Sequence, residues 1–208
     1  MNSIIAEKKF IAERTGIPYS NLSQSYLRAE TVLGSLSTYD FELQRNNVAS
    51  PTVTERLLDL NDEFVMTHLT IGVKNVASDT DAEHIVAPIQ TYANDETASG
   101  NVNPVGDNIE ALYNSSFSLT INRKEFLPEF PVRFFKRVGD TQVTATTQAS
   151  YPNGLYGFAP FEPVKIDGRM TIDASISIGT GVDLTPAAGS NYAVLECRGY
   201  LVTNVKSS

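Results

Sequence analysis

"TIDASISIG", residues 171–179, is the stretch of this sequence that shows most clearly how the chain folds. Its side chains alternate strictly between apolar and polar, with Ile172, Ala174, Ile176 and Ile178 in one set and Thr171, Asp173, Ser175 and Ser177 in the other. Successive side chains of a β-strand point to opposite faces of the sheet. The stretch therefore predicts a strand with one face in the core and the other in water.

The same alternation recurs along the chain after about Phe41. It is found in "FSLTI" (residues 117–121), "EFVMTHLTIGV" (63–73) and "NYAVLECRGYLVTNV" (191–205), and the last is long enough for a central strand. Long polar loops separate these stretches and no helical pattern alternates with them, which favours an antiparallel β-sandwich over a βαβ fold. We expect the core to contain Ile172, Ile176, Phe117, Leu119, Leu69 and Leu195, and one face of residues 63–73 to carry Val65, Leu69, Ile71 and Val73.

Residues 1–35 have a different pattern, and we expect them to form a helical N-terminal arm beside a sandwich domain of residues 36–208. "SIIAEKKFIAERTG" and "SNLSQSYLRAETVLG" place apolar residues at three- and four-residue steps and end at Gly16 and Gly34. Two short helices are predicted, each too thin to be stable alone. They pack either on their own domain or on a neighbouring subunit, and the candidate contact residues are Ile4, Ile11, Leu22, Tyr26 and Leu33.

Composition excludes several classes of protein. The 208 residues carry a net charge of −8, so the surface as a whole repels nucleic acid, and any contact with it must be local. A single cysteine, Cys197, allows no intrachain disulfide, and charged residues occupy positions 7–9, where a signal peptide needs an apolar run. The sequence predicts a protein folded in the cytoplasm. It contains no stretch of about 20 apolar residues, so no membrane span is expected.

The densest mixture of aromatic and basic residues is "NRKEFLPEFPVRFFKR", residues 122–137. A platform for stacking bases needs an uninterrupted basic groove, and Glu125 and Glu129 interrupt this one. Proline cannot donate a ladder hydrogen bond, so Pro128 and Pro131 place the segment at a sheet edge or corner, with a further strand at "VRFFKRV". We expect an edge between subunits, with Phe126, Phe130 and Arg133 in the contact, and we do not expect direct nucleic-acid binding.

Catalytic and metal-binding motifs are absent from the sequence in persuasive form. One cysteine and two separated histidines cannot supply the usual zinc ligands. The acidic cluster at residues 79–84 lacks the spacing and glycine of a calcium loop, and its members are Asp79, Asp81, Glu83 and His84. No serine lies in a Gly-x-Ser-x-Gly elbow, and Cys197 fits a buried strand position. We therefore expect no cofactor, no metal and no enzymatic activity.

The order of the segments, and phrases such as "RLLDLNDEFV" and "RGYLVTNV", resemble structural proteins of bacteriophage virions. In these proteins a jelly-roll β-sandwich carries a short N-terminal arm and ends in a long strand, and the resemblance covers Thr52 to Val205. It implies a capsid, vertex or auxiliary capsid protein, assembled in the host cytoplasm, whose partners are copies of itself and other virion proteins. The arm has nearly balanced charge, unlike the basic arms of coat proteins that package nucleic acid directly.

Two other functions are compatible with a β-sandwich. A carbohydrate-binding module would present an exposed aromatic platform; the chain has no tryptophan, but Tyr151 and Tyr156 in "SYPNGLYGF" could supply one. A hydrolase on a β-sandwich is the third alternative, because any two of the 24 acidic residues could meet in the fold.

Overall fold

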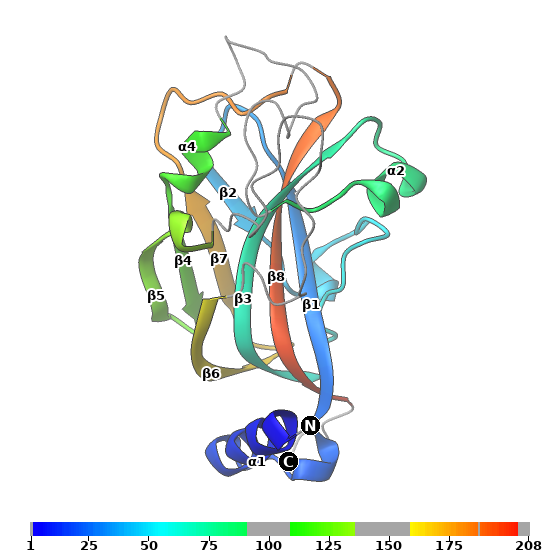
Figure 1. Cartoon of the computed structure of the whole chain (residues 1–208), viewed down its shortest axis with the longest axis vertical. Coiled ribbons are helices and arrows are strands. Elements are labelled where there is room, and N and C mark those ends of the chain that lie inside the picture. The colour runs from blue at the N-terminus through cyan, green and yellow to red at the C-terminus, as the bar shows by residue number, and fades with distance from the viewer. Residues whose placement is uncertain (1, 91–108, 136–158, 187, 204–208) are drawn as a thin grey trace.

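The computed structural model describes residues 2–90, 109–135, 159–186 and 188–203 of the chain, with the side chains of residues 2–4 and 159–161 left out. Figure 1 shows a β-sandwich with one helix beneath it and short helices along its flanks. The strands are β1 (Ser23–Val32), β2 (Thr38–Phe41), β3 (Glu63–Val76), β4 (Ser116–Ile121), β5 (Lys124–Pro131), β6 (Ala159–Asp167), β7 (Ile172–Ser177) and β8 (Ser190–Val202). The helices are α1 (Asn2–Thr15), α2 (Asp81–Val86) and α4 (Glu110–Tyr113), with 3-10 turns η1 (Tyr19–Asn21), η2 (Arg45–Asn47) and η3 (Val132–Phe135).

The strands form two antiparallel sheets of four, in the orders β1-β8-β3-β6 and β2-β7-β4-β5. We call these the first and second sheet. The pairing follows a simple rule across the described residues: β1 pairs with β8, β2 with β7, β3 with β6 and β4 with β5. The prediction of a mainly β, antiparallel two-sheet fold is confirmed.

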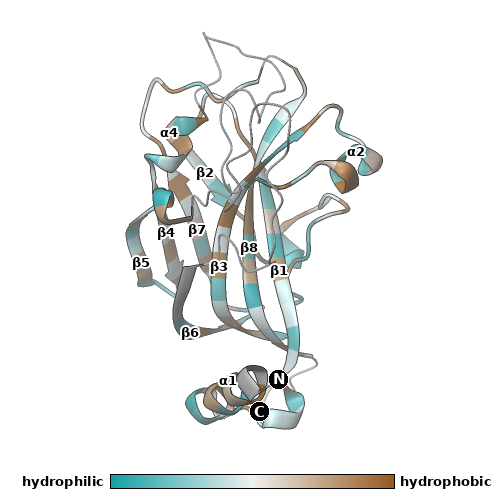
Figure 2. Ribbon diagram, in the orientation of Figure 1, coloured by the Kyte–Doolittle hydropathy of each residue, from teal (hydrophilic) through white to brown (hydrophobic). Residues whose placement is uncertain are grey.

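The core lies between the two sheets, and the alternation of the sequence accounts for it. Along the strands, apolar and polar positions alternate in Figure 2, as they do in β7, where Ile172, Ala174 and Ile176 are buried and their neighbours are not. The six residues expected in the core are all buried: Ile172, Ile176, Phe117, Leu119, Leu69 and Leu195. Burial of one face by the facing sheet thus fixes the register of each strand.

The expected second helix of the arm is wrong, because residues 23–32 form β1. All ten of them are in register with β8, from Ser23 opposite Leu201 to Val32 opposite Tyr192. The strand buries Leu27 and Ala29 in the core. Pairing with a long central strand over ten residues satisfies the backbone groups of β1 that point toward β8, and this outweighs a local helical spacing of apolar residues. Leu33, just beyond the strand, is also in the core.

One face assignment in residues 63–73 is also wrong, and a β-bulge explains it. The ladder of β3 shifts its register between Met66 and His68, so Thr67 is an extra residue. A bulge reverses the alternation on its far side. Leu69, Ile71 and Val73 face the core as expected, whereas Val65 faces outward and Phe64 and Met66 take the core positions.

The helix α1 lies below the sandwich at one end of the molecule (Figure 1), where it contacts outward-facing residues of the first sheet. A small apolar cluster holds it there, consisting of Ile11, Ile17, Leu22, Val65, Tyr200 and Val202. Burial, together with the neighbouring Glu7 carboxylate, raises the pKa of Tyr200 to about 12. Ile11 and Leu22 are buried in this cluster against their own domain, so they are not accessible to a neighbouring subunit. Tyr26 is 39% exposed. The side chain of Ile4 lies outside the described part.

Residues 124–131 form the edge strand β5, as the two prolines predicted. The strand predicted after Pro131 is wrong, because Val132–Phe135 is the turn η3. Val132 and Phe135 are both buried, and they are three residues apart, so a turn with three residues per repeat brings both to the core. Phe126 and Phe130 are half-buried at the edge, and Arg133 is exposed. Lys136 and Arg137 lie outside the described residues.

Candidate functional site

The strongest concentration of ionisable side chains lies on the outer face of the first sheet and centres on Glu30 of β1. Its side chain is only 1% exposed. Arg28 donates to Oε1 from Nε at 2.9 Å and from Nη2 at 2.6 Å, and the Thr54 hydroxyl donates to the same oxygen at 2.8 Å. Lys74 Nζ lies 2.6 Å from Oε2. The strand alternation that buries Leu27 and Ala29 in the core turns Arg28 and Glu30 to this outer face.

Lys74 lies on β3, and its side chain has no exposed surface. Its ammonium has three acceptors, namely Glu30 Oε2 at 2.6 Å, Thr54 Oγ1 at 3.1 Å and His84 Nδ1 at 2.9 Å. An ammonium carries three protons, so every one of them has a partner. This side chain has no free donor left for a ligand.

His84 is the residue of α2 that reaches this cluster. An ammonium can only donate, so Nδ1 must accept from Lys74, and Nε2 carries the proton that is donated to Asp79 Oδ1 at 2.8 Å. The Tyr192 hydroxyl of β8 donates to the same Asp79 oxygen at 3.2 Å. The rings of His84 and Tyr192 meet edge to face at 5.0 Å. We call Arg28, Glu30, Lys74, Asp79 and His84 the Glu30 cluster.

In the Glu30 cluster, burial and ionic pairing shift the pKa values of Glu30 and Lys74 in opposite directions. Burial alone would raise the pKa of Glu30, but hydrogen bonds from Lys74 and Thr54 and the charge of Arg28 lower it below its usual value. Burial lowers the pKa of Lys74, and the pairing with Glu30 offsets this only in part. The hydrogen bonds from His84 and Tyr192 lower the pKa of Asp79. Burial, with the charge of Asp79, raises the pKa of Tyr192 to about 12.

These contacts indicate that the Glu30 cluster has a structural role, because its buried charged groups are paired with one another. Two cations, Arg28 and Lys74, balance two carboxylates, Glu30 and Asp79, and each buried group is hydrogen-bonded. A buried pair of this kind gives little net stability but becomes costly when one partner is lost. The cluster joins β1 and β3 to α2, and Tyr192 links it to β8, so that the position of this short helix on the sheet is fixed.

Sequence reasoning found part of this cluster. Of the acidic group at residues 79–84, the structure brings Asp79 and His84 into contact. Asp81 is exposed. Glu83 lies in the first turn of α2, where its backbone N–H donates to the Thr80 hydroxyl. Glu30 and Lys74 were missed. Lys74 adjoins a predicted strand and Glu30 lies in a segment with helical spacing, and a solvated face explains a charged residue in either pattern equally well.

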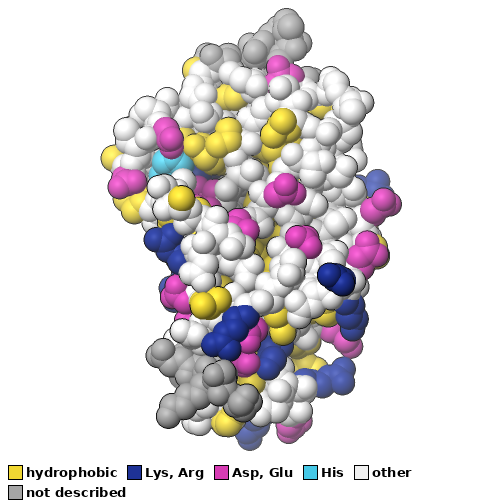
Figure 3. All heavy atoms as spheres, turned by 180° about the vertical axis from the view of Figure 1, so that it is seen from behind, with side chains coloured by type: hydrophobic (Ala, Val, Ile, Leu, Met, Phe, Trp, Pro, Cys, Tyr) yellow, Lys and Arg dark blue, Asp and Glu magenta, His cyan; other side chains and the backbone are white. Residues whose placement is uncertain are grey.

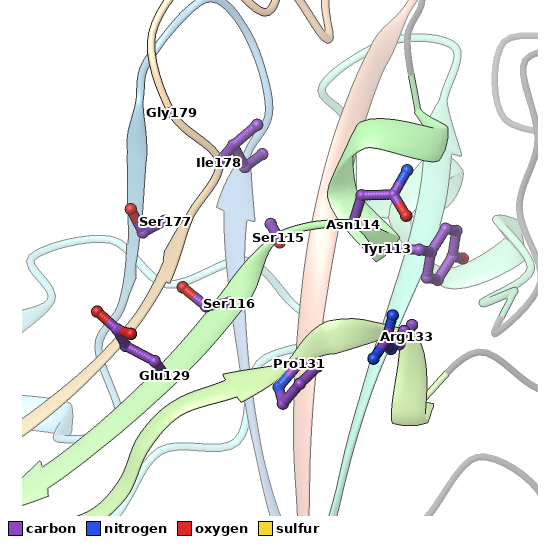
Figure 4. A pocket seen from close by; sticks show the side chains of 10 residues that line it. All are labelled: Tyr113, Asn114, Ser115, Ser116, Glu129, Pro131, Arg133, Ser177, Ile178 and Gly179. Carbon is purple, nitrogen blue, oxygen red and sulfur yellow. The ribbon is translucent and has the colours of Figure 1, made fainter.

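A cavity of about 390 Å³ lies at the end of the second sheet, between α4, η3 and the end of β7. Figure 4 shows Glu129, Ser116 and Ser177 on one side of it and Asn114 and Arg133 on the other. Glu129 lies in the left-handed region with φ of 45°, where β5 shifts its register against β4. The cavity is open to solvent, and its lining combines polar and apolar groups.

Tyr113 also lines the cavity, but its side chain is only 2% exposed, so it offers no ring face to a sugar. Tyr151 and Tyr156, the aromatic residues expected for sugar binding, lie outside the described residues. The edge residues Phe130 and Phe134 have ring centroids 5.3 Å apart, and Phe134 is 53% exposed. Neither ring lines the cavity, although both residues adjoin lining residues in the sequence.

Within the described ranges, no group of three or more His, Cys, Asp or Glu side chains could hold a metal ion. The helices in that part of the chain include none with the length and apolar character needed to cross a membrane. Comparison with protein-family models, with curated proteins and with solved structures finds no match to this chain.

Proposed function

We propose that this protein is a structural subunit of a bacteriophage virion and that its body is a jelly roll. The observation that carries the proposal is the strand order. Pairing of the first strand with the eighth, the second with the seventh, the third with the sixth and the fourth with the fifth is what two wound Greek keys produce. Capsid subunits are a major class of protein with this double-sheet architecture. The sequence resemblance to virion proteins points the same way.

The ionisable groups support a structural role. The Glu30 cluster is closed, with its buried donors and acceptors satisfied, and it holds a surface element to the sheet. A subunit that repeats one interface many times needs such fixed surface elements, because each must present the same contact in every copy. Cys197 is buried in the core, and burial raises the pKa of its thiol to about 12, so it is held as an unreactive thiol.

The edge strand β5 supplies one surface for contact with other subunits. Phe126 and Phe130 are half-buried, Phe134 is exposed and Arg133 stands beside them at the cavity. Aromatic residues and arginine are the side chains most enriched in protein interfaces. We therefore place the expected interface residues Phe126, Phe130 and Arg133 in a subunit contact at this edge.

A carbohydrate-binding module is the second candidate, because the cavity beside this edge combines Arg133 and Glu129 with serine hydroxyls. Those groups suit the hydroxyl-rich surface of a sugar, although the cavity has no exposed ring among its described residues on which a sugar could stack. Binding of the purified protein to an array of glycans tests this alternative directly.

The virion proposal is tested by the state of the purified protein. Light scattering and negative-stain electron microscopy should show regular rings, capsomers or shells as the concentration rises. Variants with Phe130→Ser and Phe134→Ser should form fewer of them. A protein that binds a glycan and stays monomeric at every concentration would refute the proposal and support the second candidate.

A further inference from the structure

The cavity at the end of the second sheet is lined by two opposite charges that do not pair with each other. Arg133 of η3 and Glu129 of β5 are both exposed, and they lie on opposite sides of the cavity (Figure 4). Among the described residues, neither charged group forms a salt bridge with any side chain. A guanidinium and a carboxylate are therefore both available to a ligand that enters the cavity.

Three uncharged polar side chains complete the lining, and they divide between the same two sides. Ser116 of β4 and Ser177 of β7 are directly opposite each other in the sheet. Figure 4 places both of these residues on the side of Glu129, whereas Asn114 lies on the side of Arg133. One side of the cavity thus combines a carboxylate with two hydroxyl groups, and the other combines a guanidinium with an amide.

The backbone that carries these groups is held in place by the fold. Arg133 lies between Val132 and Phe135, which are both buried in the core and anchor the turn η3. The backbone N–H of Val132 donates to the Ser115 carbonyl at 3.0 Å and so ties η3 to the segment that carries Asn114. A site whose walls are already in position loses little entropy when a ligand binds.

Glu129 has a backbone conformation that glycine adopts more easily. Its φ is 45°, and its backbone N–H donates to the Ser118 hydroxyl at 3.3 Å. A left-handed conformation is costly for a residue with a side chain, and such strain is concentrated at functional sites. Within the described residues, the Glu129 carboxylate has no partner that would offset this cost, so its side chain adds nothing evident to the stability of the fold.

We infer that this cavity binds a sugar that carries a carboxylate, namely a uronic acid. Arg133 would bind the sugar carboxylate through two parallel hydrogen bonds, and Glu129 would accept from ring hydroxyls on the other side. Ile178 and Pro131 are half-buried in the lining and can contact the C–H groups of the ring. The volume of about 390 Å³ is at the lower end of the roughly 300–1,000 Å³ of ligand sites, which suits a small ligand. The inference rests on carbohydrate binding, the second candidate function, and names the class of sugar.

Attraction of an anionic sugar to this place must come from the cavity itself. The chain has a net charge of −8, so its surface as a whole repels anions. In Figure 1, α4 and the end of the second sheet that bears the cavity lie in the upper half of the molecule. Seen from behind in Figure 3, most of the visible lysine and arginine side chains lie in the lower half. Binding should therefore depend on Arg133.

Three small sugars test the inference by nuclear magnetic resonance titration of the full-length, isotope-labelled protein. Glucuronate and glucose differ only at one carbon, which bears a carboxylate or a hydroxymethyl group, and glucuronamide keeps the shape of glucuronate without its charge. Glucuronate should bind with a Kd of about 1 mM and shift the amide signals of Asn114, Ser116 and Ser177. The two neutral sugars should bind at least about tenfold more weakly, because a charge-assisted hydrogen bond is lost. Light scattering on the same samples selects concentrations at which the protein is unassembled, because the proposed edge contact also includes Arg133.

Two variants, each with a matched control, assign the roles of the charged groups. Arg133→Gln should weaken glucuronate binding at least about tenfold, whereas Lys124→Gln removes a positive charge from the same strand edge outside the cavity and should bind like the wild type. Glu129→Gly should weaken binding of glucuronate and yet melt no lower than the wild type, because glycine relieves the left-handed backbone. Glu125→Gln removes the same charge from β5 outside the cavity and reports the general effect of charge.

Three results would overturn the inference: no shift of the cavity signals at about twenty times the expected Kd of glucuronate, equal binding of glucose and glucuronate, or unchanged binding in Arg133→Gln. If glucose binds the cavity as well as glucuronate does, carbohydrate binding stands and only the choice of an acidic sugar fails. If neither sugar binds, both fail. The virion proposal is judged by assembly, so none of these results decides it.

Discussion

Replacement of Glu30 by glutamine should destabilise the protein strongly at neutral pH. The amide keeps the size of the side chain but removes the negative charge that Lys74 and Arg28 share. The side chain of Lys74 is fully buried, and that of Arg28 is 14% exposed, so neither cation can rehydrate freely. Loss of one partner from a buried ion pair costs about 3–5 kcal/mol. For a chain of this length that corresponds to a fall of roughly 6–20 °C in melting temperature.

The measurement is urea unfolding followed by far-ultraviolet circular dichroism, because the chain has no tryptophan. Glu63→Gln is the matched control. It removes a carboxylate from a pair with Lys165 at 3.1 Å in the same sheet, but the lysine side chain of that pair is 40% exposed. An exposed pair contributes at most about 1 kcal/mol. If Glu30→Gln is no more destabilising than this control, the cluster does not fasten the fold as we argue.

The pH dependence of the same variant follows from the lowered pKa of Glu30. Its ordinary value is 4.5, and the folded value is lower, so the carboxylate stabilises the fold fully above pH 4.5. This contribution is lost as the pH falls through the folded pKa. The difference between wild type and Glu30→Gln should therefore shrink below pH 4.5. Adding Lys74→Met to Glu30→Gln should recover part of the loss at pH 7, because the unpaired buried cation is then absent.

Three further predictions concern packing. Gly199→Ala should destabilise the fold by at least about 2 kcal/mol in urea unfolding, because the new Cβ would lie 1.8 Å from the Val65 backbone oxygen. Gly34→Ala is the control and should be tolerated, because its new Cβ would lie 3.7 Å from the nearest atom. Cys197 should react with a thiol reagent at pH 8 only after denaturation; rapid labelling of the folded protein would contradict its burial. Ile11→Ala should cost about 2–5 kcal/mol, and a smaller loss would show that α1 is not docked.

The sequence predicted those parts of the fold in which local pattern and tertiary packing agree. In β7 the strict alternation names the buried residues directly, and the prolines of residues 124–131 place that strand at an edge. In residues 23–32 the apolar spacing suits a short helix, and only the presence of β8 as a partner decides for a strand. The extra residue at Thr67 leaves no sign in the pattern of residues 63–73, because a bulge is a property of the ladder between two strands.

The Glu30 cluster was out of reach of sequence reasoning for a similar reason. Its members come from β1, β3 and the segment around α2, and what distinguishes them from a solvated polar face is that α2 and residues 52–56 contact them. The outer face of the first sheet is thus covered in two ways. At one end α1 covers this face and is held by an apolar cluster. Elsewhere α2 covers it and is held by the Glu30 cluster. Acid should weaken the second attachment more than the first, because protonation of Glu30 removes the charge that pairs with Lys74 and Arg28, whereas Ile11 and its neighbours hold α1 by apolar contact. Acid should therefore loosen α2 on the sheet while the sandwich core stays intact.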